Sequence, residues 1–125
     1  RVRAALRTKH LHDLLMQHAQ IDPLTELLNR RALMKAFLQA WARFERYGET
    51  VSFLMTDVDH FKHVNDTYGH RLGDRVLVTI SRVLTEQARA SDVVARYGGE
   101  EFAILAPGVD VDGAVRLAER SRQCI

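Results

Sequence analysis

The residues most suited to chemistry are the segment Gly98-Gly99-Glu100-Glu101 and Asp57, an acid in the apolar run 51–58. Burying an unpaired carboxylate is costly, so Asp57 is expected to meet a metal, a cation or a hydrogen-bond network. If the two segments form neighbouring strands, their carboxylates converge, and such oxygen ligands suit Mg²⁺. Glycines also let a backbone approach a phosphate closely. On spacing alone, an exposed turn with surface glutamates explains the same residues.

Other catalytic and metal patterns are weaker. His60, His63 and His70 invite a zinc interpretation, but no cysteine lies near them and the surrounding acids favour a harder metal, so zinc is rejected. No Walker-type glycine loop is present, and no serine or cysteine stands in a recognisable nucleophile setting.

The composition is that of one ordinary globular domain. The chain has 125 residues, 46% of them hydrophobic and 27% charged, with a formal net charge of +2. Arg1, Arg3, Arg7 and Lys9 are the only crowded basic residues, and they are interpreted as a solvated helix face, so no nucleic-acid partner is indicated. No run is apolar enough to insert into a membrane. The single cysteine, Cys124, fits a reducing, cytoplasmic setting.

The elements that must position the chemical residues follow from periodicity and breakers. Asn29 is expected to cap a helix that Gly48 ends, and the stripe of Leu33, Phe37, Trp41 and Phe44 along it is interpreted as core. The predicted helices are residues 1 to about 20, 30–47, 61–68, 72–90 and 112 to the end, and the predicted strands are 51–58, 93–97 and 102–106.

These elements predict an α+β, ferredoxin-like fold. The glycines at 98 and 99 favour a tight antiparallel hairpin, because they allow the positive φ values of primed turns. The strand 51–58 is expected to run parallel to one hairpin strand through a helical crossover, which gives a mixed sheet with helices on one face. Residues 1–21 are predicted to be a linker helix, either paired in a dimer or lying on its own domain. Residues 22–125 form the domain, which is expected to continue beyond Ile125.

Several motifs occur in order and together resemble the GGDEF-domain diguanylate cyclases. The resemblance covers residue 22 to the end and implies a palm-type nucleotide cyclase fold. It implies that two GTP-loaded domains meet face to face and form cyclic di-GMP with release of pyrophosphate. The matching segments are Asp22-Pro23-Leu24-Thr25, Leu27-Leu28-Asn29-Arg30-Arg31, Thr56-Asp57-Val58-Asp59-His60-Phe61-Lys62, Val64-Asn65-Asp66-Thr67-Tyr68-Gly69-His70, Gly73-Asp74 and Arg96-Tyr97-Gly98-Gly99-Glu100-Glu101-Phe102.

The resemblance also implies residue roles. Mg²⁺ or Mn²⁺ would be held by Asp57, the carbonyl of Val58 and Glu100, and Glu100 would also be the proton acceptor. The nucleotide would be bound by Asn65 and Asp74 at the guanine edge with His70 nearby, and by Phe61 and Lys62 beside the triphosphate, while Gly98, Gly99 and Glu101 flank the site.

A product-binding inhibitory site is implied by Arg89, Asp92 and Arg120, whose guanidinium donors suit phosphate and guanine. Two departures from the family pattern stand out. Glu26 replaces the glycine usual after Asp-x-Leu-Thr, and the later segment that supplies a Lys and an Arg to the phosphates is missing. The sequence therefore predicts a C-terminally incomplete domain that is inactive as a fragment or active only within its parent.

Three functions stay open at this point. The first is a diguanylate cyclase that is inhibited by its product and acts as a homodimer behind an upstream sensory domain. The parent would be cytoplasmic or anchored to a membrane through that upstream domain. The second is a signalling module that binds GTP or cyclic di-GMP without catalysis. The third is an inactive dimerisation fragment of a cyclase.

Overall fold

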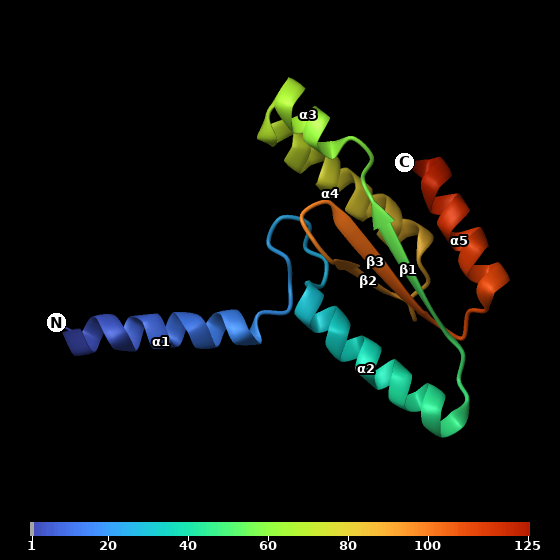
Figure 1. Cartoon of the computed structure of the whole chain (residues 1–125), viewed down its shortest axis with the longest axis horizontal. Helices are drawn as coiled ribbons and strands as arrows, with labels where there is room; N and C mark the ends of the chain where they lie inside the picture. Colours follow the sequence, from blue (N-terminus) through green and yellow to red (C-terminus); the bar gives the residue numbers. More distant parts are fainter. Residues whose placement is uncertain (1) are drawn as a thin grey trace.

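The computed structural model describes the backbone of residues 2–125 and, in that range, all side chains except those of residues 2, 3, 13 and 16–18. The order of helices and strands is the predicted one (Figure 1). The elements are α1 (Val2–His18), α2 (Arg30–Tyr47), β1 (Val51–Asp57), α3 (Phe61–Tyr68), α4 (His70–Gln87), β2 (Val93–Arg96), β3 (Glu101–Pro107) and α5 (Val111–Cys124). Helix α4 ends before the predicted residue 90, because Ala88 already has an extended backbone with ψ of 151°.

The sheet has the strand order β1-β3-β2, and both pairings are antiparallel. The prediction of a mixed sheet is therefore wrong for the three strands, although the α+β class is confirmed. β1 and β2 run in the same direction and are linked by α3 and α4, as a crossover requires, but β3 lies between them. A parallel pairing occurs at the isolated bridge between Leu28 and Ala95.

Helices cover both faces of this sheet, whereas the sequence predicted one covered face (Figure 1). The cause is visible in β3, where the consecutive residues 102–106 are all buried. Because side chains alternate along a strand, such a run needs apolar partners on both sides. Phe102 and Ile104 pack with the α4 and α5 residues Leu77 and Leu117, and Leu105 packs with Leu33 of α2.

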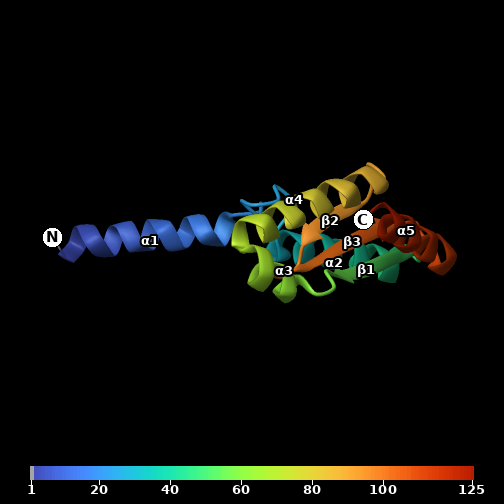
Figure 2. The same cartoon turned by 90° about the horizontal axis from the view of Figure 1, so that it is seen from above.

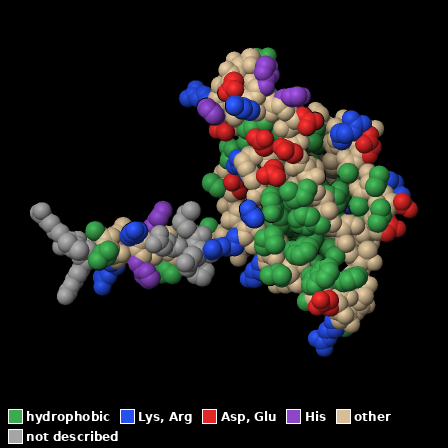
Figure 3. Space-filling model, viewed as in Figure 1, with side chains coloured by type: hydrophobic (Ala, Val, Ile, Leu, Met, Phe, Trp, Pro, Cys, Tyr) green, Lys and Arg blue, Asp and Glu red, His purple; other side chains and the backbone are tan. Residues whose placement is uncertain are grey.

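Helix α2 has the predicted caps but not the predicted core stripe. Asn29 Oδ1 accepts a hydrogen bond from the Ala32 amide at 3.0 Å, and Gly48 ends the helix with φ of 70°. Leu33 is fully buried, but Trp41 is 45% exposed and Phe44 43% exposed, so interpreting these two as core residues is wrong. Trp41 contacts Phe37 and Phe44, and Phe37 contacts Phe53 of β1, so these rings form a continuous aromatic surface over α2 and β1. Apolar side chains gather on this face of the molecule (Figure 3).

Helix α1 extends away from the sheet and its covering helices (Figure 2), so the alternative in which it lies on its own domain is wrong. Leu6 and Leu15 on it are 63% and 71% exposed. Arg1 and the side chain of Arg3 lie outside the described residues, so the predicted basic group is described only at Arg7 and Lys9. Among the helices that the structure describes, none has the length and apolarity needed to span a bilayer.

Candidate active site

The hairpin that carries Glu100 and Glu101 is built by β2 and β3, with residues 97–100 between the strands. Neither Gly98 nor Gly99 has a positive φ, so the primed turn predicted from these glycines is wrong. The connection is longer than two residues, and the Tyr97 and Gly98 amides both donate to the Glu101 carbonyl, at 2.8 and 3.2 Å. A Cβ at Gly98 would lie 2.6 Å from Glu101 Oε1, so a larger residue there would require the Glu101 side chain to move.

Strand β1 brings Asp57 beside this hairpin. Asp57 pairs with Glu101 across the β1–β3 ladder, and the Val58 amide donates to the Glu100 carbonyl at 3.1 Å. The sequence-based expectation that the two segments are neighbouring strands is confirmed. Asp57, however, is the last residue of β1 and is exposed, so the argument from a buried carboxylate is wrong.

The donor set fits a hard divalent cation. Asp57 ends β1, and Val58 and Glu100 lie just beyond the paired ends of β1 and β3. Their carboxylate and carbonyl oxygens are of the ligand type that Mg²⁺ prefers. Across the described residues, no group of three or more His, Cys, Asp or Glu side chains could hold a metal ion. A site of two carboxylates and one carbonyl does not depend on such a group, and it leaves coordination positions for phosphate oxygens and water.

The corner between α3 and α4 brings Asn65 against Gly73, and Asp74 is the next residue of α4. A Cβ on Gly73 would lie only 1.9 Å from Asn65 Oδ1, so this glycine leaves the space that the Asn65 side chain occupies. Asn65 Oδ1 is buried and has no hydrogen-bond partner among the described residues. A buried polar atom without a partner is unfavourable by about 1–3 kcal/mol, which fits a side chain that has its partner in the bound state.

The remaining predicted nucleotide residues lie on the same two helices. Phe61 is buried at the start of α3, and Lys62 next to it is exposed. His70 begins α4, and Asp74 follows one turn later, so both lie on the same side of that helix. Acidic side chains gather beside the histidines of this end of the molecule (Figure 3).

A hollow on the other side of the sheet from α2 contains the predicted inhibitory residues. It measures about 380 Å³ and is lined by Arg89, Asp92 and Arg120. Arg89 Nη2 donates to Asp92 Oδ1 at 3.1 Å, and Arg120 Nε donates to Gln87 Oε1 at 2.9 Å. Sequence reasoning missed Arg116, which lines the same hollow from α5 and which only the tertiary fold brings there.

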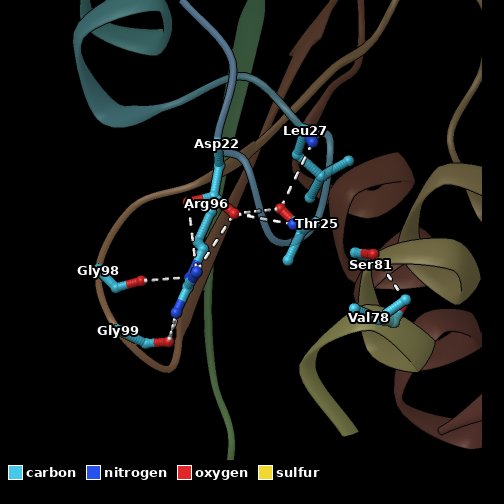
Figure 4. Close-up of polar contacts among 8 residues, drawn as sticks. All are labelled: Asp22, Thr25, Leu27, Val78, Ser81, Arg96, Gly98 and Gly99. Atoms are coloured by element: carbon cyan, nitrogen blue, oxygen red, sulfur yellow. Dashed lines mark hydrogen bonds and ion pairs between the residues drawn. The ribbon is translucent and has the colours of Figure 1, made fainter. Parts of the chain in front are cut away.

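Sequence reasoning also missed the ion pair between Asp22 and Arg96. Arg96 Nη1 lies 3.2 Å from each carboxylate oxygen of Asp22, and both side chains are largely buried (Figure 4). Burial raises the pKa of Asp22, but hydrogen bonds from Thr25 and Arg96 together lower it by a larger amount. The pKa of Asp22 in the folded chain is therefore below its usual value. The two residues are 74 positions apart, and their motifs alone gave no sign of the contact.

The fold is that of a palm-type α+β domain with an antiparallel three-stranded sheet, and comparisons with known proteins identify its family. The family model described as "Diguanylate cyclase, GGDEF domain" matches residues 19–125. The chain belongs to the diguanylate cyclase GGDEF domain family.

Individual relatives agree with the family match. The chain is 43% identical over 116 residues to the diguanylate cyclase DgcP of Pseudomonas aeruginosa, covering 93% of the chain and 17% of that relative. It is 44% identical over 102 residues to the diguanylate cyclase DosC of Escherichia coli K12, covering 82% of the chain and 22% of that relative. The chain therefore spans about a fifth of the length of these two relatives.

Solved structures agree with the fold. The diguanylate cyclase SiaD of Pseudomonas aeruginosa, determined with its activator SiaC, superposes with a TM-score of 0.81 at 40% identity, covering 97% of this chain and 46% of that one. The GGDEF domain of DgcB from Caulobacter crescentus, determined with c-di-GMP, superposes with a TM-score of 0.81 at 38% identity, covering 83% of this chain and 61% of that one.

Proposed function

We propose that this chain is the nucleotide-binding part of a diguanylate cyclase that condenses two GTP molecules into cyclic di-GMP. The observation that carries the proposal is the register of β1 against the hairpin, in which Asp57 and Val58 lie opposite Glu101 and Glu100. Kinship with named diguanylate cyclases supports the same reaction.

In the proposed reaction the 3′-hydroxyl of one GTP attacks the α-phosphorus of the other. A bond forms between that oxygen and phosphorus, the bond to the β-phosphate oxygen breaks, and pyrophosphate leaves with the electron pair. The hydroxyl proton passes to Glu100 in this proposal. The same exchange on the second GTP closes the ring, and the second nucleotide comes from a second copy of the domain.

The chain's residues would bind and orient the nucleotide, since phosphoryl transfer depends mainly on positioning and charge neutralisation. Asp57, the Val58 carbonyl and Glu100 would hold Mg²⁺ or Mn²⁺, which when bound neutralises phosphate charge. Asn65 and Asp74 would pair with the guanine edge, with His70 close by. Phe61 and Lys62 would lie along the triphosphate.

Regulation by product is the second part of the proposal. Arg89, Arg120 and Asp92 line one hollow, and guanidinium groups bind both phosphate and guanine well. Arg89 already has hydrogen bonds to Asp92 and to the Pro107 carbonyl, so it is held in place before a ligand arrives. We propose that cyclic di-GMP binds there and lowers the rate of synthesis.

The partners proposed for the parent protein follow from helix α1. Its exposed leucines and its extension away from the domain support pairing with a second copy and connection to an upstream sensory domain. GTP is the proposed substrate, and a cytoplasmic site of action is proposed because the reaction consumes it.

The test separates binding from turnover. Calorimetry with GTP and Mg²⁺ on this chain should detect binding, and the whole product of the gene should convert GTP to cyclic di-GMP. Glu100→Gln should reduce turnover at least 100-fold, whereas Glu49→Gln, at an exposed position paired with Arg43, should leave it unchanged. GTP binding without turnover in the whole product would support a non-catalytic module instead.

Inhibition has its own measurement. Initial rates of the whole product should fall as cyclic di-GMP is added, and Arg89→Ala should abolish that fall while leaving the uninhibited rate unchanged. Rates that do not respond to product in the unmodified protein would end the inhibitory part of the proposal without affecting the cyclase assignment.

A further inference from the structure

The side chain of Arg96 joins two segments that are far apart in the sequence (Figure 4). On one side its Nη1 donates to both oxygens of Asp22 at 3.2 Å. On the other side its Nη2 donates to the Gly99 carbonyl at 2.8 Å, and its Nε lies 3.2 Å from the Gly98 carbonyl. The planar guanidinium can make these contacts together because its donors form a fixed fork.

Asp22 is itself held in a fixed position. Its Oδ2 accepts hydrogen bonds from the Thr25 amide at 2.9 Å and from Thr25 Oγ1 at 2.8 Å, and Thr25 is buried. The Asp22 amide donates to the Leu27 carbonyl at 2.7 Å. The carboxylate that faces Arg96 therefore belongs to a tightly bonded loop rather than to a mobile surface side chain.

The turn on the other side of Arg96 needs such support. Gly98 and Gly99 have no side chains to restrict their backbone, and glycine has the largest conformational freedom of any residue. Their carbonyls accept from Arg96, and the next carbonyl, that of Glu100, accepts from the Val58 amide. The segment is thus held before Glu100 by Arg96 and at Glu100 by Val58, the residue that follows β1.

A second set of contacts ties the same two regions together. The Arg96 amide donates to the Leu28 carbonyl at 2.9 Å, and the Arg30 guanidinium lies 4.5 Å from the centre of the Tyr97 ring. The loop after α1 therefore contacts the hairpin by a backbone hydrogen bond and an ion pair, and the first residue of α2 adds a cation–π contact. Among these, the Asp22–Arg96 pair is the one that reaches the glycine carbonyls.

We propose that Asp22 and Arg96 are positioning residues for Glu100. Their ion pair fixes the backbone of the Gly98–Gly99 turn and thereby determines the position of the Glu100 carboxylate relative to Asp57. The proposal rests on the proposed function, in which Glu100 is a metal ligand. Neither Asp22 nor Arg96 touches the metal or the nucleotide in this proposal. Their effect passes through the backbone of the turn.

Hydrogen exchange tests the turn directly, without any ligand. The amides of Gly98 and Val58 donate to the Glu101 and Glu100 carbonyls, so both report on the hairpin. In Arg96→Lys, which keeps the charge but loses the fork, and in Asp22→Asn, their exchange should be at least tenfold faster. The amides of residues 103–105 in the buried middle of β3 should be unchanged. The matched control is Glu49→Gln, which breaks the exposed pair with Arg43 and should leave Gly98 and Val58 unchanged.

Two exchange results would overturn the proposal. One is unchanged exchange at Gly98 and Val58 in both variants. The other is acceleration by the same factor at the turn and in β3, which would mean that the ion pair supports only overall stability.

Mn²⁺ binding, measured by electron paramagnetic resonance on the full chain, tests the consequence for Glu100. Arg96→Lys should weaken Mn²⁺ binding at least fivefold, and Glu49→Gln should bind as the unmodified chain does. Faster exchange with unchanged Mn²⁺ affinity would overturn the proposal, because Glu100 would not depend on the turn. If the unmodified chain binds no Mn²⁺, the proposed metal site fails, while the exchange result still decides whether the pair holds the turn.

Discussion

Replacing Gly73 by alanine tests the packing of the α3–α4 corner on which guanine recognition is proposed to depend. The new Cβ would lie 1.9 Å from Asn65 Oδ1 and 3.3 Å from Cζ of Phe61, so the Asn65 amide must move. Within a helix, alanine is favoured over glycine by about 0.5–1 kcal/mol. Overpacking opposes this gain by about 1–3 kcal/mol. We expect a net destabilisation of about 1 kcal/mol from these two contributions.

Thermal unfolding and GTP titration together measure the effect. A loss of about 1 kcal/mol corresponds to about 4 °C in Tm for a chain of this size. Loss of one hydrogen bond to guanine should weaken GTP binding about tenfold. In an Asn65→Ala background the clash is relieved, so Gly73→Ala should there stabilise by about 0.5 kcal/mol. A single Gly73→Ala variant that is more stable than the unmodified chain and binds GTP equally well would contradict the contact between Gly73 and Asn65.

Three further predictions concern the loop between α1 and α2. Glu26 has a φ of 61°, in the left-handed region that favours glycine, so Glu26→Gly should raise the free energy of unfolding by about 0.5–1 kcal/mol in urea titrations, whereas Glu26→Ala should give no gain. Asn29→Ala loses the cap bond to Ala32 and should lower the free energy of unfolding by about 1–2 kcal/mol, with Asn29→Asp retaining the cap and losing less. The pKa of Asp22 is lowered in the folded chain, so its ionised form stabilises the fold above the unfolded pKa of about 3.9, and that stabilisation disappears as pH falls through the folded pKa. Asp22→Asn should therefore be destabilising in urea at pH 7 but not near pH 2, and an equal loss at both values would contradict the role of the charge.

Residue types at short spacing in the sequence were sufficient to predict the helices and strands and part of the candidate site. The caps at Asn29 and Gly48 follow from residue types at short spacing, and the structure has both. The strand predicted at 51–58 is observed at 51–57. The juxtaposition of Asp57 with the hairpin followed from strand adjacency, which the β1–β3 register confirms. The roles of these residues in binding and catalysis stay predictions.

Features that depend on tertiary packing could not be predicted from the spacing of residue types along the chain. Five consecutive buried residues in β3 require covering on both faces, but an apolar run of that length is also compatible with one helical layer and an edge strand. Trp41 and Phe44 have the helical spacing of core residues, yet both are more than two fifths exposed, so spacing alone does not show which turns of α2 the sheet covers. Asp22 and Arg96 meet across 74 positions, and no local rule relates them.

The exposed aromatic surface on α2 gives the protein an internal optical reporter. Trp41 is the single tryptophan of the chain, its ring stacks beside Phe37, and its Nε1 donates to Glu45 Oε1 at 2.9 Å. All tryptophan emission therefore arises from one half-solvated ring on the opposite side of the sheet from the α4 and α5 helices. Contact of any partner with this surface would shift that emission to shorter wavelength, whereas nucleotide held at the α3–α4 corner would leave it nearly constant. The wavelength of maximum tryptophan emission, compared with and without a ligand or partner, can thus distinguish occupancy of the two regions without any added label.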